Sequence, residues 1–202
     1  MAASLNFPEI SIPALLILSL AGIMLLTGRD GRWLTLALGF QYIGVFLLVF
    51  LTWPLNLAVV KLVAGWMAAA LLGVGLVGAP VHVFLEERFS PSGRVFRLLA
   101  AFMVSLTMLS VARRVSGWFP GVGMEMIYGT LLLVGFGTLQ LGLTARPIRV
   151  ILGLLTVLGG FEVLYAVLEK AVLVAGMLAA LNLGLAMVGV YLISVPGAET
   201  NQ

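Results

Sequence analysis

The chain contains no cysteine and only one histidine, His82, among its 202 residues. Without cysteine it cannot form a disulfide, a thiolate nucleophile, a cysteine-ligated zinc site or an iron–sulfur cluster. A single histidine also excludes bis-histidine haem and metal sites that need several imidazoles. The GxSxG, HExxH and GxxxxGKS/T motifs are missing as well. We therefore expect a chain that is not an enzyme by itself, with no catalytic residue, no metal and no cofactor.

Charged residues are scarce, and their scarcity excludes a soluble domain. They make up 9% of the chain, as 11 basic and 8 acidic residues, against 62% apolar residues. A soluble globular chain carries about 25% charged and about 45–50% apolar residues, so these few charges cannot cover a water-exposed surface. The basic residues are scattered among loops, which is not the stripe that binds nucleic acid. The composition predicts an all-α integral membrane protein that contacts the lipid bilayer and binds no nucleic acid.

Long apolar runs predict seven membrane-spanning helices. A helix needs about 20 apolar residues to cross the hydrocarbon layer, and charged or turn residues separate runs of that length here. The fourth run is the most polar, because Arg97 lies near its start and it contains several hydroxyl side chains. The predicted spans are 10–27, 33–52, 55–79, 95–112, 122–143, 148–168 and 171–194.

The basic residues predict how these spans are oriented. When the loops are assigned alternately to the two sides, seven basic residues fall on one side: Arg29, Arg32, Arg88, Arg94, Arg97, Arg146 and Arg149. Three fall on the other side: Arg113, Arg114 and Lys170. Cytoplasmic loops carry the excess of basic residues, so we predict an outside N-terminus and a cytoplasmic C-terminus. The expected location is the inner (plasma) membrane, with multiple passes.

The sequence also contains an internal match. Residues 62–78 and 173–189 agree without a gap at ten of seventeen positions. Three spans per repeat is an odd number, so an extra span between two copies would let both face the same way. We therefore predict two parallel three-helix repeats joined by one linker helix, a 3+1+3 plan. Its parts are repeat 1 in 1–80, the linker loop and fourth span in 81–120, and repeat 2 in 121–202.

The third span of each predicted repeat carries small residues at fourfold spacing, a pattern that lets helix backbones approach closely in lipid. We interpret these stripes as packing surfaces. They are Gly65, Ala69 and Gly73 in the first repeat and Gly176, Ala180 and Gly184 in the second.

Two ionisable residues, Lys61 and Glu162, lie inside predicted spans, where charges are costly and are functional candidates by default. Each lies six residues, or about 9 Å at 1.5 Å per residue, from the same predicted surface. This shared depth permits an ion pair between the repeats, with either a structural or a proton-relay role. The alternative is that Lys61 extends to the headgroups while Glu162 contacts another subunit.

Two amides, Gln41 and Asn182, lie deeper, about 14–17 Å from the starts of their spans. Buried amides most often form hydrogen bonds between helices, and this is the favoured interpretation. Gln140 and Tyr42 are weaker candidates of the same kind. Glu162, Lys61, Asn182 and Gln41 are thus the candidate proton-path or intramembrane polar residues.

The basic first loop, the segment RPIRVILGLLTVLGG and the segment LAALNLGLAMVGVYL resemble the three-helix NuoK-type subunit of respiratory complex I and the C subunit of Mrp antiporters. The seven-span plan resembles component E of hydrogenase-4. The resemblance implies partner subunits of the antiporter-like and quinone- or hydrogenase-module kinds. It also implies family glutamates at the places of Gln41 and Leu155 and near Ala69 and Ala180, so the carboxylates are absent there, and Asn182 is the closest polar substitute in the last case.

We therefore expect an accessory membrane subunit of a redox-linked, ion-translocating complex that scaffolds the complex and lines a proton pathway. One alternative is a stand-alone small transporter or channel. Another is a purely structural subunit of a different bioenergetic or photosynthetic assembly.

Overall fold

The computed structural model describes residues 7–77, 91–144, 146–169 and 171–194, and these are helical apart from short connections. Among them, seven helices are long and apolar enough to cross a membrane, as predicted. His82, and most of the loop expected at 80–94, lie outside the described residues. The helices are α1 (Phe7–Thr27), α2 (Gly31–Phe50), α3 (Leu55–Val77), α5 (Pro91–Val115), η1 (Ser116–Trp118), α6 (Met124–Leu143), α7 (Pro147–Leu168) and α8 (Val172–Ser194).

Local residues explain where the helices begin and end. Pro147 is the first residue of α7, a position where proline's missing N–H costs no hydrogen bond. The α2–α3 connection contains Pro54, and the segment before α6 contains Gly121, whose φ of 91° suits glycine. Helix α5 extends beyond the predicted 95–112 at both ends, because arginine is a good helix former and the apolar limit of a run is not the helical limit.

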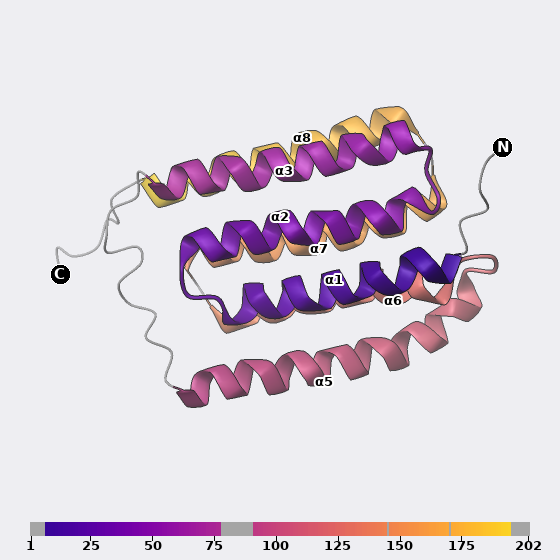
Figure 1. Cartoon of the computed structure of the whole chain (residues 1–202), viewed down its shortest axis with the longest axis horizontal. Helices are drawn as coiled ribbons and strands as arrows, with labels where there is room; N and C mark the ends of the chain where they lie inside the picture. The colour runs from indigo at the N-terminus through magenta and orange to yellow at the C-terminus, as the bar shows by residue number, and fades with distance from the viewer. Residues whose placement is uncertain (1–6, 78–90, 145, 170, 195–202) are drawn as a thin grey trace.

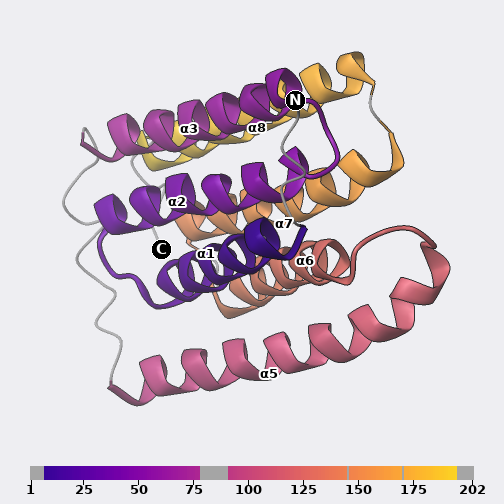
Figure 2. The same cartoon turned by 45° about the vertical axis from the view of Figure 1, so that its right-hand side comes forward.

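The helices form two layers of three (Figure 1). Helices α1, α2 and α3 make one layer, and α6, α7 and α8 make the other. Helix α1 packs on α6, α2 on α7 and α3 on α8, and α5 lies outside the layers against α6 and α1 (Figure 2). Following the chain in Figure 1, α1, α3, α6 and α8 run in one direction and α2, α5 and α7 in the other.

The bundle has two ends. The basic end contains the α1–α2 and α6–α7 loops and the start of α5, and the far end contains the α2–α3 and α7–α8 loops and the segment between α5 and α6. At the far end, Trp53 Nε1 donates to the Glu169 carbonyl oxygen at 3.2 Å and so ties the two loops together.

Glycines allow close helix contacts in parts of the core. A Cβ added at Gly65 would lie 2.2 Å from the Tyr42 ring, so only glycine leaves room for this ring between α2 and α3. The stripe on α8 is different. A Cβ at Gly176 or Gly184 would meet no described atom within 4 Å, and both residues face outward. The close packing that the second stripe predicts is therefore not made within the described part of this chain.

Two arginines that the sequence assigns to a loop side are buried in the basic end. Arg149, 1% exposed, donates from Nη1 to the Leu25 carbonyl at 3.2 Å and from Nη2 to the Gly28 carbonyl. Arg97, 7% exposed, donates to the Leu26 carbonyl at 3.1 Å. The last carbonyls of α1 lack intrahelical partners and carry partial negative charge, so buried guanidinium groups satisfy them. Both arginines lie at the end of the bundle to which the sequence assigns them, but they are buried against α1 and are not solvated charges.

Candidate functional site

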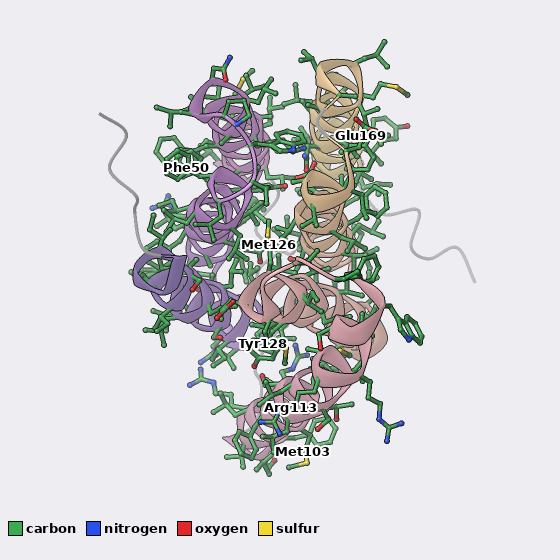
Figure 3. All side chains as sticks on the ribbon, turned by 90° about the vertical axis from the view of Figure 1, so that its right-hand side faces the viewer. Phe50, Met103, Arg113, Met126, Tyr128 and Glu169 are labelled. Carbon is green, nitrogen blue, oxygen red and sulfur yellow. The ribbon has the colours of Figure 1, made fainter. Side chains whose placement is uncertain are left out.

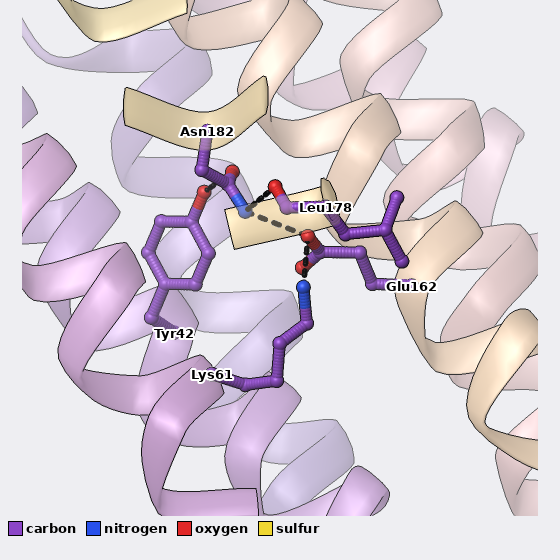
Figure 4. A network of polar contacts seen from close by, with 5 residues as sticks. All are labelled: Tyr42, Lys61, Glu162, Leu178 and Asn182. Carbon is purple, nitrogen blue, oxygen red and sulfur yellow. Dashed lines mark hydrogen bonds and ion pairs between the residues drawn. The ribbon is translucent and has the colours of Figure 1, made fainter. Parts of the chain in front are cut away.

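An ion pair lies between the two layers, where Lys61 of α3 meets Glu162 of α7 (Figure 4). Lys61 Nζ donates to Glu162 Oε1, and the side chains are only 2% and 1% exposed. Lys61 is therefore buried and paired, and it does not extend to the headgroups. The common depth of the two residues, noted from the sequence, corresponds to a direct contact between the layers.

Asn182 of α8 and Tyr42 of α2 extend this pair into a network. Asn182 Nδ2 donates to Glu162 Oε1 at 2.6 Å and to the Leu178 carbonyl at 3.2 Å. The Tyr42 hydroxyl donates to Asn182 Oδ1 at 2.6 Å. The four side chains come from α2, α3, α7 and α8, so the network joins both layers at one point (Figure 4).

Side-chain direction explains why Asn182 reaches Glu162 although the sequence places them at different depths. In a helix the Cα–Cβ bond tilts toward the helix N-terminus. Helix α7 starts at the basic end and α8 at the far end, so the two side chains tilt toward each other along the bundle. Counting residues from the ends of the spans does not include this tilt.

The network concentrates polar groups in a dry environment. The charges of Lys61 and Glu162 cancel, and a buried pair is tolerated only when further hydrogen bonds satisfy its remaining atoms. Glu162 Oε1 receives donors from Lys61 and Asn182, whereas Oε2 has no hydrogen-bond partner among the described residues. The carboxylate therefore keeps one oxygen available to a further donor.

Gln41 lies next to Tyr42 on α2 but makes a different contact. Its Oε1 lies 3.2 Å from the Thr156 hydroxyl of α7, which also lies 2.8 Å from the Leu152 carbonyl. A hydroxyl has one proton and can donate fully to only one of them. Gln41 Nε2 has no acceptor among the described residues, so turning the amide would let it donate to the Thr156 oxygen. Either arrangement links α2 to α7.

Of the four candidate residues, three are brought together directly: Lys61, Glu162 and Asn182. Gln41 is joined to α7 through Thr156 instead. Tyr42, only a weaker candidate, is a full member of the network. The sequence feature that indicated it is a hydroxyl side chain next to the midspan amide of Gln41. Thr156 was missed, because a helical threonine commonly bonds to its own helix.

Gln140 lies elsewhere. Its Nε2 donates to the Arg149 carbonyl at 3.0 Å, and this bond joins α6 to α7 near the basic end. No group of three or more histidine, cysteine, aspartate or glutamate side chains that could hold a metal ion occurs among the described residues. The arrangement around Glu162 can hold a desolvated charge pair and can exchange a proton within it.

Comparison with known proteins found no family model, no curated protein and no solved structure that matches this chain.

Proposed function

We propose that this chain is an accessory, non-catalytic membrane subunit of a multi-subunit, redox-linked ion-translocating complex of the membrane-bound hydrogenase, complex I or Mrp type. The observation that carries the proposal is the network of Tyr42, Lys61, Glu162 and Asn182 between the layers. Ionisable residues inside spans are rare and most often belong to ion or proton pathways. The described connections between α1 and α2, α2 and α3, and α6 and α7 are short and contain no soluble domain.

The 3+1+3 repeat plan belongs to this proposal. Its support is the gapless match of 62–78 with 173–189, together with the same direction of the two layers and the outer position of α5. Two copies facing the same way place corresponding helices side by side. Each copy then contacts the other through a different face. Lys61 of the first copy can therefore pair with Glu162 of the second without an equivalent ion pair elsewhere in the bundle.

In the proposed pathway, Glu162 and Lys61 are the proton-carrying groups. Transfer of a proton from the Lys61 ammonium to the Glu162 carboxylate converts a charged pair into a neutral one, with no change in net charge. Asn182 holds Oε1 toward Lys61, and Tyr42 fixes the Asn182 amide. The free Oε2 is the atom through which a proton from a water or a neighbouring subunit would enter.

The proposed path differs from that of the family that the sequence resembles. Gln41 and Leu155 hold two of the expected glutamate positions, and the other two fall near Ala69 and Ala180. We therefore propose a rerouted path through Glu162 and Lys61. The excess of basic residues at one end supports a cytoplasmic basic end in the plasma membrane, with antiporter-like and quinone- or hydrogenase-module subunits as partners.

The experiment is a pumping assay on the intact complex carrying Glu162→Gln, after purification in mild detergent. We expect co-purified partners with flavin, nickel or iron–sulfur centres. We also expect normal assembly and clearly reduced proton pumping per electron transferred. Asp30→Asn, an exposed carboxylate at the basic end, is the matched control and should pump normally.

Two other outcomes would count against the proposal. Unchanged pumping in an assembled Glu162→Gln complex would remove Glu162 from the pathway. A homogeneous homo-oligomer that transports a solute would instead support a stand-alone transporter.

A structural role is the second candidate, favoured by the complete burial of the pair. In that case Glu162→Gln would reduce assembly, and whatever complex forms would pump at the normal ratio of protons to electrons.

A further inference from the structure

A cavity lies at the far end of the bundle, among residues that are not part of the buried network. Its volume is about 410 Å³, and the start of α1, the ends of α2 and α7 and the segment entering α6 bound it. Figure 3 looks onto this end and labels Met126, one of the lining residues. Small-molecule sites have volumes of about 300–1,000 Å³, so the cavity is large enough for a ligand.

Three oxygen-bearing side chains line this cavity: the hydroxyls of Ser11 and Thr52 and the carboxylate of Glu125. Ser11 is 2% exposed, and its hydroxyl has no hydrogen-bond partner among the described residues. Glu125 forms no ion pair with any cation in the described part of the chain. The Thr52 hydroxyl donates its proton to the Val49 carbonyl at 3.1 Å, so its oxygen offers lone pairs to the cavity.

Two glycines in the segment before α6 affect the space around the Glu125 carboxylate. Gly121 has a φ of 91°, which turns the chain just before α6. A Cβ added at Gly123 would lie 3.0 Å from Glu125 Oε2. The glycine therefore leaves room for the carboxylate to fold back over the start of α6.

We infer that this cavity binds a primary ammonium group that carries an apolar chain. An ammonium has three N–H donors and no acceptor, which matches a cavity whose polar side chains offer a carboxylate and two hydroxyl oxygens and include no basic residue. The carboxylate adds a charge-assisted hydrogen bond. An apolar chain would lie against the lining residues Leu51, Val122, Met126 and Val167.

The ammonium has two sources of the same chemistry, an aminophospholipid headgroup and a free alkylamine. The test measures the binding of phosphatidylethanolamine and of hexylammonium to the purified full-length protein in detergent, by native mass spectrometry and by titration. Phosphatidylcholine is the headgroup control, because its nitrogen has no N–H. Asp30→Asn is the control for loss of a carboxylate away from the cavity.

We expect Glu125→Gln to weaken binding of at least one of the two amines about tenfold or more, as loss of a charge-assisted hydrogen bond predicts. Phosphatidylcholine should bind equally to the wild type and to Glu125→Gln. Asp30→Asn should bind all three ligands as the wild type does. Tighter binding of the lipid identifies the headgroup as the source, and tighter binding of hexylammonium identifies a free amine.

The inference is overturned if Glu125→Gln binds both amines as the wild type does, or if it weakens phosphatidylcholine to the same extent. It is also overturned if sodium ions raise the unfolding temperature of the wild type and hexylammonium does not, because the cavity would then bind a metal cation and not an amine. Should Glu125→Gln fail to fold, Ser11→Ala tests the site, because the Ser11 hydroxyl has no partner to lose in the described structure. This variant should bind the amine severalfold more weakly, and equal binding would refute the site.

Discussion

Breaking the Lys61–Glu162 pair from one side should cost far more than removing both charges. Both side chains are almost fully buried, at 2% and 1% exposure. With Lys61→Met, the Glu162 carboxylate stays between the layers with Asn182 as its remaining described donor. Removing one partner of a buried pair costs about 3–5 kcal/mol, because it leaves an uncompensated charge. We expect a loss of this size in the free energy of unfolding.

The double variant Lys61→Met/Glu162→Gln removes both charges and keeps an oxygen that can accept from Asn182. Neutral replacements of buried ion pairs are often close to neutral in stability, so the expected loss is about 0–2 kcal/mol. The double variant should therefore be more stable than Lys61→Met alone by about 1–5 kcal/mol.

Reversible unfolding in mixed micelles, with increasing fractions of denaturing detergent, measures these differences. Arg32→Met is the matched control, because Arg32 is exposed at the basic end and a surface change of this kind stays within about 0.5 kcal/mol. The reasoning is refuted if Lys61→Met costs less than about 1 kcal/mol, or if the double variant is as unstable as the single one.

Two further predictions concern packing and helix ends. Gly65→Ala should lower the free energy of unfolding by about 1–3 kcal/mol, because the new methyl group overlaps the Tyr42 ring. Gly176→Ala meets open space inside a helix, so it should leave this free energy unchanged or raise it by up to about 1 kcal/mol. Equal effects of the two substitutions in the same unfolding assay would contradict the packing described. Arg149→Met should cost about 1–3 kcal/mol and speed amide exchange in the last turn of α1, since it removes the donors to the Leu25 and Gly28 carbonyls. Unchanged exchange there would show that Arg149 does not hold the end of α1.

The sequence was sufficient to predict the class of protein and its helices. Hydropathy and turn residues are local properties, so the runs ending near Thr27, Leu143 and Leu168 have nearly the same limits in the structure. The burial of Arg149, in contrast, could not be predicted from local properties. A basic residue near the start of a span appears to be solvated in the sequence, and only the contact between Arg149 and the end of α1 shows that it is buried.

The sequence predicted part of the candidate site, namely which residues are costly to bury. It could not predict that Tyr42 would bond to Asn182, because these residues are separated by 140 positions and their contact depends on how α2 and α8 are rotated and offset. It also could not show that Gly176 faces outward while Gly65 packs against a ring. Small residues at the same spacing occur at both places.

The sequence alone therefore determined a helical membrane protein with seven spans, because each helix satisfies its own backbone hydrogen bonds and needs only an apolar run of sufficient length. The tertiary structure alone decided which polar side chains meet. Hydrogen bonds between side chains of different helices require a particular rotation and axial position of each helix. These are set by packing of the two layers, as at Gly65 and Tyr42, and are not local properties of any span.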